Sequence, residues 1–101
     1  MSCRLSLGPS SYSGMVLDLS RTGLFIQTSA GARPGAEIAV NVHSAGFTTP
    51  IALSAQVVWQ RRVPQQLRTL VKGGIGLKIQ RAPESYYRLL ADVSRGSPTR
   101  G

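Results

Sequence analysis

Three residues at a fixed spacing are the strongest candidates for chemistry in this chain. Asp18, Ser20 and Gly23 form a D-x-S-x-x-G pattern within the stretch VLDLSRTGLFI. Together they could present a carboxylate, a hydroxyl and uncovered backbone to one small molecule. A carboxylate only accepts hydrogen bonds, so it suits a paired donor edge such as the N1–H and N2–H₂ groups of guanine.

The same pattern also suits a tight turn between two strands. Asp and Ser side chains satisfy nearby backbone groups in turns. Gly23 permits a positive φ or a close approach by a ligand. The pattern alone therefore leaves a ligand site and a purely structural turn as alternatives.

Other reactive side chains are sparse. The chain has one cysteine, Cys3, and one histidine, His43, which excludes an intrachain disulfide and argues against a metal site of three or four such ligands. The sequence also lacks a nucleophile elbow, a glycine-rich phosphate loop and paired carboxylates. We therefore predict neither a catalytic nor a metal site.

The charge balance is strongly basic. The 101 residues include 12 Lys and Arg against 4 Asp and Glu, a formal net charge of +8. Most of the cations are arginine, whose planar guanidinium suits phosphate and guanine edges. This balance favours a nucleotide, a nucleic acid or an acidic protein as partner. An arginine-rich composition with fully solvated charges would give the same count.

Six short segments, separated by turn residues, are predicted to be the strands that position these groups. They span residues 3–7, 12–19, 23–28, 37–43, 51–60 and 74–79. Apolar and polar residues alternate along them, as is typical of an antiparallel sheet with one face in water. The faces predicted to be apolar are Met15, Leu17 and Leu19; Ile38, Val40 and Val42; Ile51, Leu53, Ala55, Val57 and Trp59; and Ile75, Leu77 and Ile79.

The last element changes its period to that of a helix. Pro83 and Glu84 suit a first helical turn, and Gly96 ends the element. One apolar stripe is formed by Tyr86, Leu89, Leu90 and Val93. We therefore predict an all-β fold, a six-stranded antiparallel β-barrel with one C-terminal α-helix. It forms one domain over residues 3–95, followed by a frayed tail at 96–101.

Two further features bear on location and on loops. No apolar run approaches the ~20 residues needed to span a bilayer, and the N-terminus lacks the apolar core of a signal peptide. We therefore expect a cytoplasmic protein without a membrane span. The long connection at residues 61–73 is predicted to be functional or mobile.

With its later segments, the chain resembles the PilZ domain family. The D-x-S-x-x-G turn is followed by QVVW at residues 56–59 and GGIGLKI at residues 73–79, in the order and spacing of that family, and the resemblance covers residues 3–93. It implies a six-stranded barrel with a C-terminal helix. It also implies a bacterial receptor for cyclic di-GMP that controls motility, pili or exopolysaccharide, with no cofactor beyond this regulatory ligand.

The resemblance implies ligand contacts at Asp18, Ser20 and Gly23. The family's second motif, R-x-x-x-R ahead of the first strand, is not matched, because Arg4 is followed four positions later by Gly8. Two missing arginine contacts would cost roughly 3–6 kcal/mol of binding free energy. Arg4 and Arg21 stay candidate contacts, and Arg61 and Arg62 are further substitutes. An arginine pair upstream of Met1 would supply the missing arm.

Two alternatives follow from these observations. Without the arm, the chain would be a divergent PilZ adaptor that contacts a protein of the motility, pilus or exopolysaccharide machinery. A small basic barrel could instead bind single-stranded nucleic acid by stacking bases on aromatic side chains. That second alternative is disfavoured, because Phe25 and Trp59 are as readily core residues.

Overall fold

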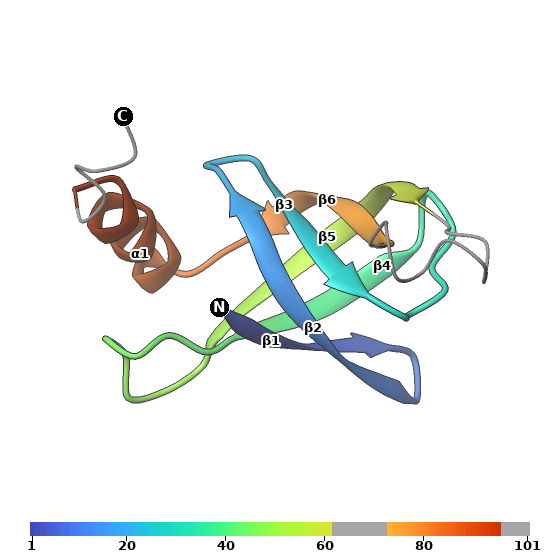
Figure 1. Cartoon of the computed structure of the whole chain (residues 1–101), viewed down its shortest axis with the longest axis horizontal. Coiled ribbons are helices and arrows are strands. Elements are labelled where there is room, and N and C mark those ends of the chain that lie inside the picture. The colour runs from blue at the N-terminus through green and yellow to red at the C-terminus, as the bar shows by residue number, and fades with distance from the viewer. Residues whose placement is uncertain (62–72, 96–101) are drawn as a thin grey trace.

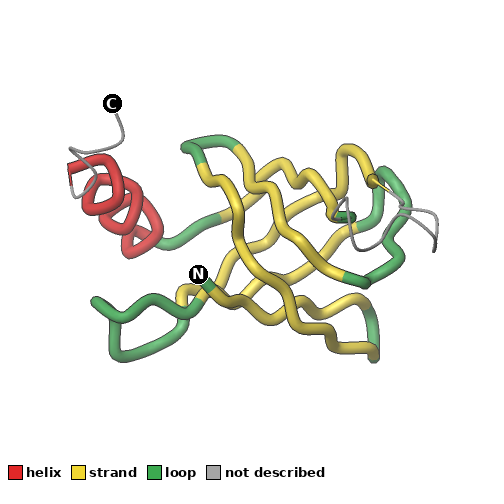
Figure 2. Tube along the Cα trace, in the orientation of Figure 1, coloured by secondary structure: helices red, strands yellow, loops and turns green. Residues whose placement is uncertain are grey.

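The computed structural model describes residues 1–61 and 73–95 of the chain. Six strands precede one helix: β1 (Ser2–Leu7), β2 (Ser10–Leu19), β3 (Gly23–Thr28), β4 (Glu37–Val42), β5 (Ile51–Arg61), β6 (Gly74–Arg81) and α1 (Glu84–Arg95). The strands close into a barrel in the order β1-β2-β3-β6-β5-β4 (Figures 1 and 2). All six pairings are antiparallel. The predicted fold class is therefore confirmed.

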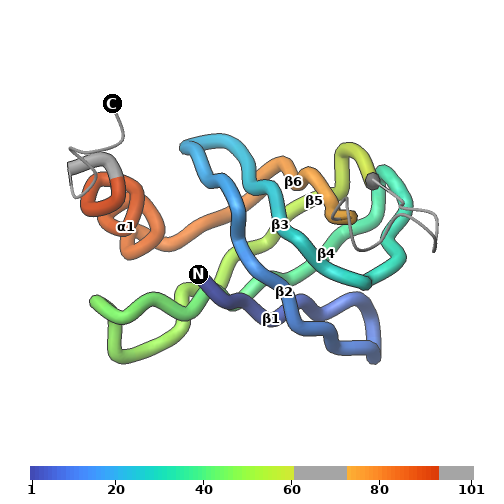
Figure 3. Tube along the Cα trace, in the orientation of Figure 1, coloured from blue at the N-terminus to red at the C-terminus, as the bar shows by residue number. Residues whose placement is uncertain are grey.

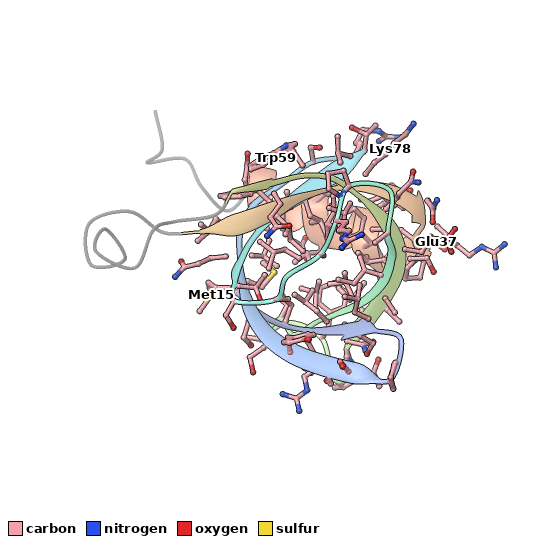
Figure 4. All side chains as sticks on the ribbon, turned by 90° about the vertical axis from the view of Figure 1, so that its right-hand side faces the viewer. Met15, Glu37, Trp59 and Lys78 are labelled. Atoms are coloured by element: carbon pink, nitrogen blue, oxygen red, sulfur yellow. The ribbon has the colours of Figure 1, made fainter. Side chains whose placement is uncertain are left out.

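The interior of the barrel is apolar, as the period of two predicts. Inward-facing positions come from every strand, and Figure 4 shows their side chains filling the ring. The largest fully buried strand residues are Leu5, Ile26, Ile51, Ile75, Val40, Val42 and Val57. Closure pairs both edges of every strand and leaves none free.

The face predicted for β2 is wrong at two positions. Met15 and Leu17 are 43% and 49% exposed, whereas Val16 is 7% exposed. The register with β3 shifts between Val16 and Asp18, which is a β-bulge. The bulge adds one residue to β2, so Val16 before it and Leu19 after it both face the core. A strict period of two counted back from Leu19 therefore puts Met15 and Leu17 on the wrong face. Leu19 is partly buried against the core, as predicted.

The face predicted for β5 is wrong at its end for the same reason. Residues 51–57 alternate as predicted, but the register with β6 shifts between Val57 and Trp59. Val58 is 52% exposed and Trp59 is 43% exposed. Trp59 therefore lies on the outer surface, as Figure 4 shows, and not in the core.

The helix α1 packs beside the barrel with the predicted stripe inward. Tyr86 and Leu89 are buried, and Leu90 and Val93 pack partly against the core. Figure 3 shows α1 following β6 at the end of the barrel where β2 leads into β3. The Glu84 carboxylate lies in the first turn, where its interaction with the helix dipole is favourable. The predicted terminator Gly96, the tail at 96–101 and most of the connection at 61–73 lie outside the described residues.

Candidate functional site

The D-x-S-x-x-G residues form the corner between β2 and β3. Ser20 closes this corner, because its backbone N–H donates to the Gly23 carbonyl at 2.9 Å. Its hydroxyl accepts from the Gly23 N–H at 3.2 Å and from the Thr22 N–H at 3.4 Å. The Ser20 side chain thus holds the turn, as the structural interpretation of the pattern expects. Asp18 and Ser20 both lie exposed at this corner.

Gly23 allows a close approach, but the group that approaches it is backbone and not a ligand. Its φ is not positive. A Cβ on Gly23 would lie 2.6 Å from the Leu77 carbonyl oxygen, so the residue allows β6 to pass close to β3. Of the two roles that the sequence leaves open for Gly23, a positive φ is not adopted, and the close neighbour is the chain itself.

A row of residues crosses four strands on the outer face beside the turn. Asp18 pairs with Phe25, Phe25 with Gly76, and Gly76 with Trp59. The Phe25 and Trp59 rings stack with centroids 5.1 Å apart and an angle of 24°. Gly76 lies beneath the indole, where any Cβ would collide with the ring. The row therefore sets a carboxylate beside two stacked aromatic rings.

The turn and this row line one shallow hollow of about 270 Å³. Its lining combines the motif residues with the outer-face aromatics: Asp18, Leu19, Ser20, Gly23, Leu24, Phe25, Val58, Trp59, Gly76 and Leu77. Lys78 is exposed at the next outward position of β6, where it pairs with Gly23. The hollow thus offers acceptors, flat apolar surface and a nearby cation.

The helix supplies two more contacts to the turn. The Tyr86 hydroxyl donates to the Ser20 carbonyl at 2.6 Å. Burial raises the pKa of Tyr86 to about 12, so the hydroxyl keeps its proton at neutral pH. The Arg21 guanidinium lies over the Tyr87 ring, 5.7 Å from its centroid. Arg21 is therefore held beside the turn, as its sequence position predicts.

Arg4 is not brought to the turn. It pairs with Ser13, and its guanidinium donates to the Ser13 hydroxyl at 3.4 Å. Ser13 precedes Asp18 by five residues on β2, about 16 Å along the strand. The side chain of Arg61 and the whole of Arg62 lie outside the described residues. Among the predicted arginines with described side chains, Arg21 alone lies at the turn.

The sequence interpretation missed Phe25, Trp59, Tyr86 and Lys78 as neighbours of the site. The aromatic pair had a usable signal, because Gly74 and Gly76 leave the first half of the outer face of β6 without side chains. A stripe without side chains on an exposed strand face invites aromatic cover from its neighbours. The contacts of Tyr86 depend on how α1 docks, which its stripe does not reveal.

The match to a known protein family extends over most of the chain. The PilZ domain matches residues 1–96. The chain belongs to the PilZ domain family. PilZ domains are binding and adaptor modules related to cyclic di-GMP signalling, so this PilZ chain is such a signalling module. Its partners are accordingly expected among the dinucleotide and proteins. No curated protein and no solved structure matches it.

In residues 1–61 and 73–95, no three His, Cys, Asp or Glu side chains are grouped closely enough to hold a metal ion. Over the same part of the chain, no helix has the length and hydropathy that a bilayer crossing requires.

Proposed function

We propose that this PilZ module binds cyclic di-GMP in the hollow beside the Asp18–Gly23 corner. The supporting observation is the row that joins Asp18 to the stacked Phe25 and Trp59 rings next to the turn. A guanine base needs an acceptor for its N1–H and N2–H₂ edge and a flat surface for its face. The hollow offers both within one lining.

The charged groups beside the hollow suit the phosphates. Arg21 presents a guanidinium from the turn itself, and Lys78 presents an ammonium from β6, where it pairs with Gly23. Charge-assisted hydrogen bonds of this kind are roughly twice as strong as neutral ones. These two cations take over part of the role of the unmatched arginine motif.

The start of the chain also lies close to the corner. The Met1 carbonyl accepts a hydrogen bond from the Val16 N–H at 2.8 Å, two residues before Asp18. An arginine arm upstream of Met1 would therefore join β1 at a point alongside β2, two residues from Asp18. With such an arm, affinity for the dinucleotide should rise by two to four decades, which corresponds to roughly 3–6 kcal/mol.

The test is a titration of the chain with cyclic di-GMP. Binding is monitored by calorimetry and by the fluorescence of Trp59, the only tryptophan. Binding should change the fluorescence, and Asp18→Ala should weaken affinity about tenfold or more, because a charge-assisted contact is lost. Glu37→Ala is the matched control, since this exposed carboxylate on β4 does not line the hollow. No heat and no spectral change at high micromolar dinucleotide would refute the proposal.

A second candidate function is an adaptor that acts through protein contact. It is favoured by two exposed apolar side chains that line the hollow, Val58 and Trp59, which are 52% and 43% exposed. Trp and aromatic anchors ringed by polar groups are typical of protein interfaces. A pulldown would support this function if it recovers one partner with the wild type and Glu37→Ala but loses it with Val58→Asp. A chain that binds the dinucleotide and retains no partner contradicts it.

A further inference from the structure

Two successive residues of α1 hold the corner between β2 and β3. Tyr86 donates its hydroxyl proton to the Ser20 carbonyl, and Tyr87 lies under the Arg21 guanidinium. The two rings also meet edge to face, with centroids 5.5 Å apart and an angle of 78°. The helix thus contacts both the backbone and a side chain of the turn that faces the proposed ligand.

The Tyr86 contact fixes the backbone of the turn. Tyr86 is fully buried, so its ring has little freedom to move. The same Ser20 residue donates its N–H to Gly23 and accepts two amide hydrogens on its hydroxyl. A movement of the Ser20 carbonyl therefore disturbs both the helix and the Thr22 and Gly23 amides.

The Tyr87 contact orients the charged group of the turn. A guanidinium that lies over an aromatic ring uses its face, and its N–H donors point outward in its own plane. Arg21 therefore keeps these in-plane donors available to an anion while the ring restrains its position. Preorganisation of this kind increases affinity because less freedom is lost on binding.

We propose that α1 is the response element of the Asp18–Gly23 corner, coupled to it through Tyr86 and Tyr87. The helix stabilises the ligand-ready turn, and by reciprocity an occupied turn stabilises the docked helix. A ligand in the hollow thereby changes the stability of the docked helix, and the outward face of α1 can respond to that change. The choice of cyclic di-GMP as ligand rests on the proposed function, whereas the coupling of turn and helix does not.

The coupling is tested first in the free chain. Tyr86→Phe removes only the hydroxyl, and amide shifts and hydrogen exchange of Thr22 and Gly23 are followed by NMR. We expect these amides to shift and to exchange about two- to tenfold faster, as for one lost hydrogen bond. Tyr12→Phe on β2 is the matched control, since it removes a phenol hydroxyl that makes no contact with the turn.

The second test uses cyclic di-GMP and hydrogen exchange across α1. Saturating dinucleotide should slow exchange in α1 about fivefold or more, the lower range of measured couplings. Tyr87→Leu should reduce this slowing and weaken affinity, whereas Tyr87→Phe, which keeps a ring under Arg21, should restore both. Rescue by the aromatic variant separates a positioning role from a general loss of helix packing.

The outcomes separate this inference from the proposed function. Dinucleotide binding without any change in α1 overturns the inference and leaves the function standing. Absence of binding, with Thr22 and Gly23 still responding to Tyr86→Phe and not to Tyr12→Phe, supports the coupling and refutes the function. Absence of both responses overturns both.

Discussion

At the residue scale, Gly76 decides whether the aromatic half of the site exists. Because it has no side chain, the indole of Trp59 lies directly on the β6 backbone and reaches Phe25. Gly76→Ala should force the ring to move and cost about 1–3 kcal/mol of unfolding free energy, as overpacking does. Urea unfolding measures this cost, and the emission of Trp59 should shift. Gly46→Ala, at a position with open space around it, should leave both nearly unchanged.

Some residues of the site could be placed from the residue pattern, and others could not. The positions of Asp18, Ser20 and Arg21 at one corner follow from their spacing, because the three residues between the two strands leave room only for a turn. The position of Trp59 does not follow, because strict alternation places its side chain on the same inward face as that of Val57. The neighbourhood of Tyr86 and Ser20 does not follow either, because 66 residues separate them and no local rule joins them.

At the scale of the element, two of the three register shifts in the sheet, in β2 and near the end of β5, decide which large apolar side chains are exposed. They put Leu17 and Trp59 on the surface, and they leave Val16 buried in β2 with Leu19 partly buried beyond the bulge. Alternation predicts the unbulged strands well, as Ile38, Val40 and Val42 show. It fails where a strand gains a residue, and the extra residue carries no distinctive sequence signal.

The exposure of Leu17 can be tested against a buried leucine of the same sheet. Leu5 is fully buried, whereas Leu17 is 49% exposed. Leu5→Ala should therefore cost about 2–5 kcal/mol, since it opens a cavity in the core. Leu17→Ala should stay within about 0.5 kcal/mol of the wild type, as surface changes do. Equal losses for the two variants in urea unfolding would show that β2 has no bulge at Leu17.

At the scale of the whole molecule, closure of the barrel made the fold predictable. Six amphipathic strands need a common interior, and one helix with an apolar stripe needs a place to dock. A closed antiparallel barrel satisfies both needs and leaves no strand edge unpaired. The order β1-β2-β3-β6-β5-β4 is not implied by these needs alone, because it depends on β3 pairing with β6 across a long stretch of chain.

The whole molecule should also lose stability at alkaline pH, because two buried acids must ionise. Burial raises the pKa of the Cys3 thiol from 9.0 to about 11 and that of Tyr86 from 10.0 to about 12. Both pKa values are higher in the folded than in the unfolded chain, so the folded state holds these protons more tightly. The stabilisation is complete below about pH 9 and is lost as the pH rises toward 12. Each group contributes on the order of 2–3 kcal/mol.

Urea unfolding between pH 7 and 12 measures this loss. The contribution of these two groups to the free energy of unfolding should be constant up to about pH 9 and should then fall. Tyr86→Phe has no hydroxyl to ionise, so its fall should be shallower between about pH 10 and 12, and Cys3→Ala should flatten the earlier part. Tyr12→Phe should keep the wild-type slope. If Tyr86→Phe falls as steeply as the wild type, Tyr86 ionises without opening the contact between α1 and the corner, and α1 is held there by Leu89 and its apolar neighbours instead.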